Sequence, residues 1–510
     1  MQMIVELLLW KLRILYNLKI LIQFFICGLL SSLLFPPFFI LPIGFIIFPL
    51  LFFLLINKKI QNKNKLFHFN SGLAYGIGMN LIILIWIKEP FLIDKSTNNI
   101  SAFSYLLVFY CSIYFGLSFL IISFFKNHFT KLILIPILFV TSEILRESFA
   151  YGFPWVTFAL VHAGNIFTLN LIYYIGTYGL SYFTILIFLI PGSIIQIYDK
   201  DSINFILKTY ISTSLIVALL SIVLIFIRFE NNINKEKLLL NTSIIQFNLS
   251  QIDRNKINAE KRFKQIEEVI NQNDTDLLIF AENEYPYLIT DLKDLNFMTN
   301  HLQNNQSIII GGTIKENSKF FNTLILLEKN NIQKFNKIIL VPFGEFLPFR
   351  KFLPFLDAIV GRSDFTSGNN IRLLKTFNNL NILPIICYEI IFLNDLLNQN
   401  NIGSELLINI TNDAWFGDLS GPYQHFYLSR MRTVEFNKPL IRVSNNGISA
   451  VMDNYGRIID YIPLNKRAVV NSKISVPHAL VNLKSYHSLI LVFLFILFIV
   501  AIMINRRFND

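Results

Sequence analysis

The sequence predicts a polytopic α-helical membrane domain, with about eight transmembrane helices, joined to an exported α/β domain. The first prediction rests on composition: 54% of the 510 residues are hydrophobic and only 15% are charged, a balance that ordinary soluble proteins do not have. The second rests on a change of pattern. Between residues 229 and 487 the long apolar runs give way to short β-rich runs that alternate with polar helical stretches, which is typical of a layered α/β domain.

Seven apolar spans precede the polar region and an eighth follows it. They cover residues 20–34, 35–56, 71–87, 103–125, 132–149, 169–197, 205–227 and 489–504. At about 1.5 Å per residue, most of them are long enough to cross a hydrocarbon core of roughly 30 Å. The first span begins like a signal peptide, but no small-residue cleavage site follows it. We therefore expect an uncleaved anchor.

Positive residues predict the orientation of these spans. Lysine and arginine gather at the N-terminus, in alternate loops between the spans, and at Arg506-Arg507. Because cytoplasmic loops carry the excess of positive charge, we expect both termini in the cytoplasm. The predicted domains are a seven-helix N-terminal transmembrane domain over residues 1–228, an exported domain over residues 229–487, and a last helix with a short cytoplasmic tail over residues 488–510.

Charge and cysteine content restrict the possible partners. The net charge of +11 is explained by lysines and arginines beside the membrane spans, so it does not point to nucleic acid. Cys27, Cys111 and Cys387 are too few and too scattered for a disulfide framework, and no CxxC motif or Cys/His cluster suggests zinc. We expect neither a metal nor a cofactor.

The exported region contains several short strands and two helical stretches. We expect strands at residues 243–249, 277–281, 307–311, 322–327, 338–341, 382–386, 405–410, 440–444 and 448–452, and helices at residues 255–271 and 422–436. A region of this length can bury a core of its own.

The apolar run 382–386 places Cys387 at the end of a buried strand, and Asn394-Asp395 follows in a segment with the pattern of a short helix. At a strand-to-helix turn, backbone N–H groups and the helix dipole favour the thiolate, which is the form that attacks carbonyl groups. The alternative is a small core residue, the usual role of a lone cysteine in an apolar run.

Two other charged residues stand beside apolar runs. Glu282 follows the run 277–281, where a carboxylate is either a solvated strand end or a positioned general base. Lys337 precedes the run 338–341, where it is either an exposed strand start or the cation of a site. Together the three groups can transfer an acyl chain: Glu282 takes the thiol proton, Cys387 attacks the acyl carbonyl, and Lys337 stabilises the developing oxyanion.

The order of these residues and the words around them resemble a known family. A strand-end glutamate, a lysine before Val341-Pro-Phe-Gly-Glu345 and the word Cys387-Tyr-Glu389 are similar to the Glu-Lys-Cys triad of the nitrilase superfamily. The words at residues 340–348, 411–417 and 421–447, with Phe35-Pro-Pro-Phe38, Ser142-Glu-Ile-Leu-Arg146 and Gly152-Phe-Pro-Trp155, resemble apolipoprotein N-acyltransferases. The resemblance covers essentially the whole chain.

This resemblance implies an αββα nitrilase-like sandwich for the exported domain and the last step of bacterial lipoprotein maturation as the reaction. The enzyme would take a fatty acyl chain from a phospholipid and hold it as a thioester on Cys387. It would then pass the chain, in ping-pong fashion, to the α-amino group of the N-terminal diacylglyceryl-cysteine of a lipoprotein. The resemblance also implies a multi-pass protein of the bacterial inner membrane, with its catalytic domain on the periplasmic face, and we expect a monomer.

The resemblance also assigns supporting residues around the triad. Glu345 would support the lysine or serve the acyl-enzyme stage, while Tyr388 and Glu389 would shape the site beside the thiol. For Glu345 and Glu389 the alternative is an ordinary salt-bridge or capping carboxylate.

The segment 346–360, which we call the apolar arm, is unusually hydrophobic for a loop on an exported domain. Exposed apolar patches of this kind mark membrane or ligand contact, and Arg350-Lys351 could meet lipid phosphate. We expect Phe349 and Phe352 to dip into the outer leaflet and gate the access of the acyl chain. The alternative is a loop packed over the domain's own core.

Weaker predictions concern residues outside these motifs. Glu143 and Arg146 lie near the outer end of the fifth span, where charges have a functional role by default. They either shape the lipid entrance or join two helices. Trp415 either packs in the core or forms part of the substrate wall, and His162 and His425 are interpreted as structural.

One departure from the family pattern bears on substrate contacts. The segment near Asn255 lacks the tryptophan that the family commonly carries there.

Two other functions compete with acyl transfer. A membrane-tethered carbon–nitrogen hydrolase would use the same triad with water as acceptor, but it needs neither the leading spans nor the apolar arm. A transporter would need spans rich in paired polar residues or broken inverted repeats, and the sequence has little of either. The acyltransferase is therefore the preferred prediction.

Overall fold

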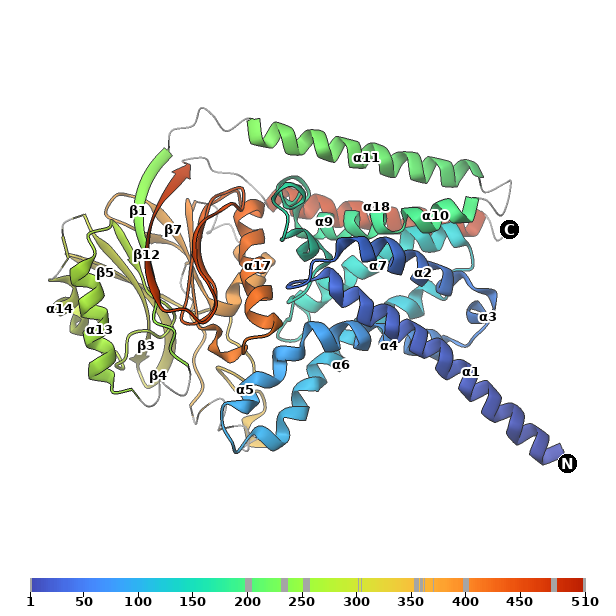
Figure 1. Ribbon diagram of the computed structural model, residues 1–510, viewed down its shortest axis with the longest axis horizontal. Coiled ribbons are helices and arrows are strands. Elements are labelled where there is room, and N and C mark those ends of the chain that lie inside the picture. Colours follow the sequence, from blue (N-terminus) through green and yellow to red (C-terminus); the bar gives the residue numbers. More distant parts are fainter. Residues whose placement is uncertain are drawn as a thin grey trace.

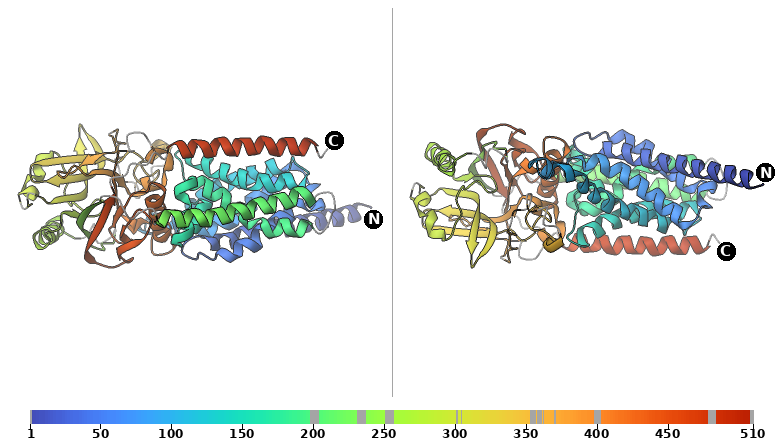
Figure 2. Two further views of the ribbon diagram at one scale, coloured as in Figure 1. Left: turned by 90° about the horizontal axis from the view of Figure 1, so that it is seen from above. Right: turned by 90° about the horizontal axis from the view of Figure 1, so that it is seen from below.

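The protein consists of a helical bundle with a two-sheet sandwich at one end (Figure 1). The computed structural model describes residues 2–197, 204–230, 237–250, 257–300, 302–303, 305–352, 357, 361, 363–369, 371–397, 403–477 and 484–507. Views from above and below show the same division (Figure 2). The start of the first helix and the end of the last helix both lie at the end of the bundle remote from the sandwich.

Apolar helices of different lengths build the bundle. They are α1 (Gln2–Ser31), α2 (Gly44–Ile56), α4 (Lys65–Ile83), α6 (Tyr105–Ile122), α7 (His128–Ser148), α9 (Ile172–Phe188), α10 (Ile190–Ile197), α11 (Asn204–Glu230) and α18 (Lys484–Arg507). Among the described residues, five helices are long and apolar enough to cross a membrane, or six if one bent pair counts as a single span. This count is lower than the eight spans expected from the sequence.

Two of the expected spans differ for local reasons. The span at 35–56 is reduced to the short apolar helix α2, because Pro36 and Pro37 stand where the chain would have to continue helically. The span at 71–87 is bent by 68° after α4. The carbonyl of Ile83, at the bend, accepts a hydrogen bond from Gln424 of the sandwich (3.0 Å). The span expected at 205–227 lies within α11, a helix of 27 residues.

The sandwich contains two six-stranded sheets, ordered β12-β1-β2-β3-β4-β5 and β11-β10-β9-β8-β7-β6. The strands of the first sheet are β1 (Lys237–Gln246), β2 (Leu277–Ile279), β3 (Ser307–Glu316), β4 (Lys319–Glu328), β5 (Asn331–Asn336) and β12 (Ala468–Pro477). Those of the second are β6 (Leu374–Lys375), β7 (Asn381–Ile386), β8 (Leu406–Thr411), β9 (Leu440–Ser444), β10 (Ser449–Met452) and β11 (Ile458–Ile462). In the centre of each sheet the strands run parallel, β1-β2-β3 and β7-β8-β9.

Helices cover both outer faces of the sandwich. Alternate residues of the first sheet, such as Leu278 and Ile308, point outward and pack with α13 (Ala259–Gln272) and α14 (Asn296–Thr299). Their neighbours Leu277 and Ile309 point inward to the common core with the second sheet. On the far face of the second sheet, α17 (Ser420–Glu435) lies between the sandwich and the bundle (Figure 1). The predicted αββα layering is confirmed.

Most expected strands overlap observed ones, but the strand expected at 338–341 is wrong. These residues are irregular, and a carboxylate from elsewhere in the chain occupies the N–H groups of Ile338 and Ile339. The sequence also failed to indicate β5, β6, β11 and β12. Each of these stands at an edge of its sheet, with many exposed or half-exposed residues, so its apolar pattern is weak.

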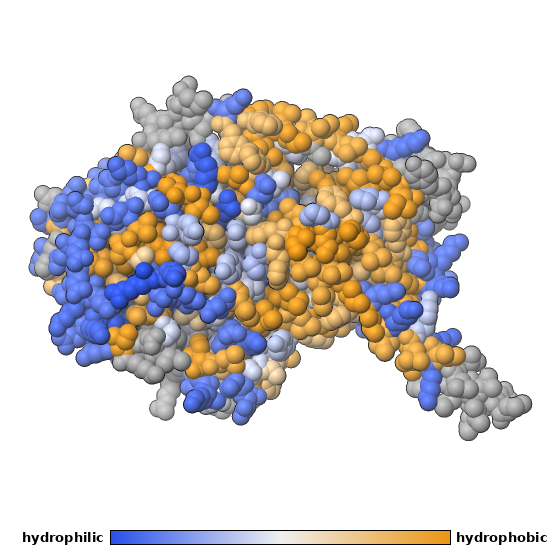
Figure 3. All heavy atoms as spheres, viewed as in Figure 1, coloured by the Kyte–Doolittle hydropathy of each residue, from blue (hydrophilic) through white to orange (hydrophobic). Residues whose placement is uncertain are grey.

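The surface of the protein divides in the same way as the fold. Apolar side chains dominate the bundle, whereas polar side chains dominate the outer end of the sandwich (Figure 3). Since helices that are apolar on their outer face need lipid around them, this surface agrees with the membrane spans.

Candidate active site

Glu282 stands just beyond β2, at the edge where the parallel strands of the first sheet end. Its side chain is buried and both oxygens are bonded: Oε1 accepts from Asn322 Nδ2 (2.7 Å) and Oε2 accepts from the Asn412 amide (2.8 Å). Gly311 of β3 permits this position, because a Cβ there would lie 2.7 Å from the Cα of Glu282. The carboxylate is therefore aimed by its neighbours rather than solvated.

Lys337 directly follows β5 and is only 1% exposed, so it is not an exposed strand start. Its Nζ lies 2.9 Å from Glu345 Oε1 and 3.6 Å from Glu282 Oε1. Burial opposes the charge, but the two carboxylates outweigh it and raise the pKa of Lys337. The site therefore holds a permanently charged ammonium group.

Cys387 directly follows β7 and begins the 3₁₀-helix η9 (Cys387–Ile391). Its backbone is left-handed, with φ of 51°, a conformation that is rare and strained for residues other than glycine. Burial and the charge of Glu282 raise the pKa of the thiol, and the nearby Lys337 does not offset them. The raised pKa favours the thiol over the thiolate that such a turn favours, so a base is needed to take the proton.

The structure brings Glu282, Lys337 and Cys387 into one buried cluster. Burial raises the pKa of Glu282, whereas Lys337 and a side-chain hydrogen bond from Cys387 lower it, and the net direction is upward. A carboxylate with a raised pKa beside a protonated thiol can accept the thiol proton, and a buried cation can stabilise an oxyanion. These are the parts that acyl transfer by a cysteine requires.

Glu345 is the second carboxylate on the lysine. It sits in the turn after Val341 and accepts hydrogen bonds from Lys337 Nζ (2.9 Å), Asn322 Nδ2 (2.8 Å) and the Val341 amide (2.8 Å). Asn322, which the sequence did not single out, bridges Glu345 and Glu282. Glu282 and Glu345 thus share the ammonium group of Lys337, and the neutral amide of Asn322 donates to both carboxylates.

Glu389 lies fully buried two residues beyond the thiol, and both of its oxygens are bonded. They accept from the backbone amides of Ile338 (2.8 Å) and Ile386 (2.9 Å) and from Arg372, whose Nη2 lies 2.7 Å away. Burial opposes the charge on Glu389, but Arg372 outweighs it and lowers the pKa. Glu389 thus fastens the end of β7 to the segment that follows Lys337.

Replacing Arg372 with methionine is expected to destabilise the sandwich strongly. Removing one partner of a buried ion pair leaves an uncompensated charge, which costs about 3–5 kcal/mol, and Arg372 also bonds Asp395 (2.7 Å). The midpoint of thermal unfolding in detergent should fall clearly. As a control, Lys264→Met removes the exposed pair with Glu260 and should leave the midpoint unchanged. Equal midpoints for the two variants would contradict this role.

A second polar cluster beneath Cys387 was missed by sequence reasoning. Arg442 of β9 is fully buried and donates to Asp413 Oδ2 (2.6 Å) and Asn409 Oδ1 (2.5 Å). Asp413 Oδ1 lies 2.9 Å from Nδ1 of His425, whose Nε2 lies 3.3 Å from the carbonyl oxygen of Cys387. The only available signal was the unusual arginine inside an apolar strand.

Tyr388 joins the site to the membrane half. Its hydroxyl donates to the carbonyl of Gly152 (3.0 Å), and its ring lies 6.4 Å from that of Phe153. A second link is made by Glu147 of α7, which accepts from the amide of Asn394 (2.7 Å). The segment that carries the nucleophile is therefore held by the end of α7 and by the loop that follows it.

Glu143 and Arg146 bind the same loop. Glu143 Oε1 accepts from the amide of Phe158 (2.7 Å), and Arg146 Nη2 donates to the carbonyl of Val156 (2.6 Å). Trp415 lies half-buried in the 3₁₀-helix η11 (Asp413–Trp415). A role of Glu143 and Arg146 at the lipid entrance, and of Trp415 in the substrate wall, stays a prediction.

Gln424 of α17 is the centre of the contact between the two halves. Its Oε1 accepts from the indole nitrogens of Trp86 (3.2 Å) and Trp155 (2.7 Å), and its Nε2 donates to the carbonyls of Ile83 (3.0 Å) and Pro36 (3.3 Å). One buried amide thus joins three separate segments of the bundle to the helix behind the active site.

The described part of the apolar arm is buried at Leu347 and Pro348 but exposes its two phenylalanines. The side chains of Phe349 and Phe352 are 74% and 81% accessible, so these two rings do not pack over the core of the sandwich. Arg350, predicted to meet lipid phosphate, instead pairs with Asp357 and Asp364 and donates to the carbonyl of Gly361 (2.9 Å). Residues 353–356 and 358–360, like the segment around Asn255, lie outside the described residues.

Comparisons with known proteins cover both halves of the chain. The apolipoprotein N-acyltransferase N-terminal domain matches residues 27–190, and the carbon-nitrogen hydrolase family matches residues 243–478. Apolipoprotein N-acyltransferase of Rickettsia typhi is 30% identical over 479 residues, 89% of this chain and 92% of the relative. That of Rickettsia bellii is 30% identical over 507 residues, 94% and 97% of the two chains. The solved structure of Saccharomyces cerevisiae Nit3, from the nitrilase superfamily, matches with a TM-score of 0.36 and 19% identity, covering 50% of this chain and 94% of that one.

Proposed function

The chain belongs to the apolipoprotein N-acyltransferase family, and from this premise we propose that it acylates lipoproteins through a thioester on Cys387. The acyl donor is a phospholipid, and the acceptor is the α-amino group of the N-terminal diacylglyceryl-cysteine. The observation that carries the proposal is the buried cluster of Glu282, Lys337 and Cys387, in which a carboxylate and an ammonium group lie beside a protonated thiol.

In the first half-reaction Glu282 takes the thiol proton while the sulfur of Cys387 attacks the ester carbonyl of the phospholipid. The carbonyl oxygen becomes an oxyanion, which the charged Lys337 stabilises. The intermediate then collapses: the C–O ester bond breaks, the lysophospholipid alkoxide takes the proton from Glu282, and a thioester remains. Burial keeps the site dry, so each of these charges acts at greater strength than in water.

In the second half-reaction the lipoprotein amine attacks the thioester carbonyl. Glu282 removes the proton from the attacking nitrogen, and Lys337 again stabilises the oxyanion. The C–S bond breaks, an amide forms, and the sulfur of Cys387 recovers its proton from Glu282. Glu345 keeps Lys337 in place throughout, because it binds the ammonium group directly (2.9 Å).

The protein is a multi-pass membrane protein. Its orientation follows from the distribution of lysine and arginine, which favours cytoplasmic termini. The beginning of α1 and the end of α18 lie together at the end of the bundle remote from the sandwich (Figure 2), and this supports a sandwich on the periplasmic face of the inner membrane. We expect the protein to act as a monomer.

The apolar arm contacts the outer leaflet and admits the acyl chain. Replacing Phe349 and Phe352 with serine is then expected to weaken the turnover of phospholipid vesicles while the protein stays folded, because two exposed aromatic anchors are lost. The measurement is the rate of lysophospholipid release, with thermal unfolding as the check on folding. Phe297→Ser is the matched control: this phenylalanine is also exposed, but it lies on α14 at the outer end of the sandwich. Equal rates for the arm variant and the control would remove this role.

The experiment that tests the proposed function separates a transferase from a hydrolase. The purified protein is incubated with phospholipid and a synthetic diacylglyceryl-cysteine peptide, and the products are measured by mass spectrometry. A transferase yields peptide heavier by one fatty acyl group in step with lysophospholipid. Free fatty acid in place of acylated peptide would instead show that water is the acceptor and would support a hydrolase.

A further inference from the structure

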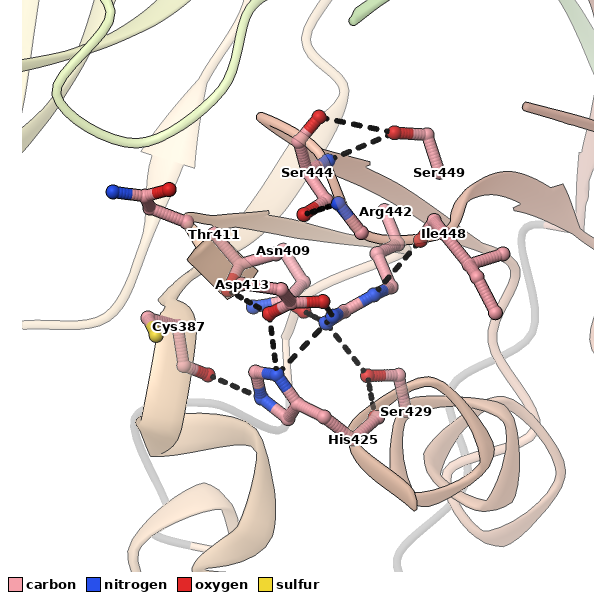
Figure 4. Close-up of polar contacts among 12 residues, drawn as sticks. Cys387, Asn409, Thr411, Asp413, His425, Ser429, Arg442, Ser444, Ile448 and Ser449 are labelled. Carbon is pink, nitrogen blue, oxygen red and sulfur yellow. Dashed lines mark hydrogen bonds and ion pairs between the residues drawn. The ribbon is translucent and has the colours of Figure 1, made fainter. Parts of the chain in front are cut away.

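The carbonyl group of Cys387 has a buried hydrogen-bond partner that the acyl-transfer mechanism does not use. His425, on the inner face of α17, lies with Nε2 3.3 Å from that oxygen (Figure 4). The ring is fully buried. In the close-up the carbonyl of Cys387 faces the ring, while the sulfur lies on the other side of the backbone. The histidine therefore contacts the peptide of the nucleophile and not its reactive atom.

This contact matters because the backbone of Cys387 is strained. A left-handed φ of 51° at a residue with a side chain persists only where its surroundings hold it. One residue earlier, the Ile386 amide is held by Glu389 (2.9 Å). On the C-terminal side, the carbonyl of Cys387 is held by His425. Rotation of the Cys387–Tyr388 peptide, which carries that carbonyl, would change the backbone conformation of Cys387 and move the sulfur relative to Glu282 and Lys337.

The contact with Cys387 requires a proton on Nε2 of His425, because a carbonyl oxygen only accepts. With that proton on a neutral ring, Nδ1 is an acceptor, and Arg442 Nη2 lies 3.1 Å from it. With a proton on each ring nitrogen, Nδ1 instead donates to Asp413 Oδ1 at 2.9 Å. In each of these two states Nε2 donates to Cys387, and the Asp413–Arg442 pair fixes the position of the ring.

The ring is also fixed from the membrane side. Trp155 stacks on His425, with ring centroids 5.6 Å apart and an interplanar angle of 29°. The indole nitrogen of Trp155 is in turn held by Gln424 (2.7 Å). The position of His425 behind Cys387 thus depends on the packing of the loop that carries Trp155 against α17.

We propose that His425 is a positioning residue for acyl transfer: its Nε2–H holds the Cys387 carbonyl and so aims the sulfur at the acyl group. The proposal rests on the proposed function, since it takes Cys387 as the nucleophile. It assigns to His425 a task beyond the structural role expected from the sequence.

Three substitutions of His425 separate this role from simple support of the fold. Glutamine and methionine have similar lengths, and both lose the contacts of Nδ1 with Asp413 and Arg442. Only glutamine keeps a donor for the Cys387 carbonyl. Asparagine has the opposite property: it reaches the Asp413–Arg442 side but not the carbonyl. The readout is the single-turnover rate of Cys387 acylation at saturating phospholipid, together with KM and the midpoint of thermal unfolding.

We expect His425→Gln to acylate within about threefold of the wild-type rate, and His425→Met and His425→Asn to be slower by about 10- to 100-fold with KM unchanged, since small misplacements of a reacting group have effects of this size. The proposal is overturned if glutamine and methionine are equally slow, or if asparagine keeps the wild-type rate. If one slow variant does not fold, the other still makes the comparison with glutamine. The wild type is the reference. A wild-type protein that forms no thioester contradicts the proposed function. If the wild type forms the thioester, the rates of the three variants test the role of His425.

Discussion

Replacing Cys387 with alanine is expected to lower the rate of lipoprotein acylation by at least about 10⁴-fold, the scale seen when a nucleophile is removed from an enzyme. The reason is that no other group in the cluster can form the acyl intermediate: Glu282 and Lys337 are a base and a cation. The remaining site would still bind lipid and polarise the ester carbonyl, but it would lack the nucleophile that attacks this carbonyl. The measurement is the initial rate of peptide acylation at saturating phospholipid.

The other two cysteines provide matched controls. Cys27 and Cys111 are buried in the membrane half, like Cys387 in the sandwich, and they are free thiols. Cys27→Ala and Cys111→Ala should keep the wild-type rate, because neither lies in the cluster. Comparable activity of Cys387→Ala and the wild type would contradict the thioester pathway.

Replacing Glu282 with glutamine is expected to lower the rate by about 10²- to 10⁴-fold, the usual contribution of a positioned general base. The Cys387 thiol is protonated at rest because burial and the charge of Glu282 raise its pKa, so the reaction cannot proceed without a base. An amide of the same shape cannot take the proton. It would also turn a donor toward either Asn322 or the Asn412 amide, both of which donate to Glu282 in the wild type.

The loss of the general base should also change the pH dependence of the acylation rate. Since burial raises the pKa of Glu282 above that of an ordinary carboxyl group, the wild-type rate should fall as the pH falls through that raised pKa. The glutamine variant should lack this acidic limb. Glu284→Gln is the control, because Glu284 is a buried carboxylate two residues away that lies 3.9 Å from Arg262. An unchanged acidic limb in Glu282→Gln would assign the base to another group.

The positions of Glu282 and Cys387 could be predicted because each follows a buried strand from the parallel centre of its sheet. Each stands directly after a short apolar run that is complete in itself, so the local pattern is sufficient. The two-part architecture was equally accessible, since composition alone separates membrane helices from a polar α/β domain.

The burial of Lys337 could not be predicted in this way. The apolar run after it has the pattern of a strand, yet the real strand is the polar segment β5 before it, at the edge of the sheet. The decisive interaction is the carboxylate of Glu389, which takes the amides of Ile338 and Ile339 and keeps them from any ladder. That carboxylate comes from 50 residues further along the chain, and no local periodicity reports it.

The buried polar groups were missed for the same reason. Arg442 meets Asp413 across 29 residues, and Gln424 meets Trp86 across 338. Such partners are chosen by the tertiary fold, because a buried polar group must find a hydrogen bond wherever the packing provides one. The pKa of Cys387 depends on the tertiary fold in the same way. The local turn favours a thiolate, whereas burial and the charge of Glu282 raise the pKa and favour the thiol.

The thioester on Cys387 is tested most directly by intact-mass spectrometry of the protein after incubation with phospholipid and no acceptor. A thioester on Cys387 predicts a mass increase of one fatty acyl group that neutral hydroxylamine removes and that Cys387→Ala lacks. Addition of a diacylglyceryl-cysteine peptide should then clear the adduct and yield acylated peptide. A protein that acylates the peptide while its acyl adduct remains absent, or lies on a residue other than Cys387, would contradict the thioester on Cys387.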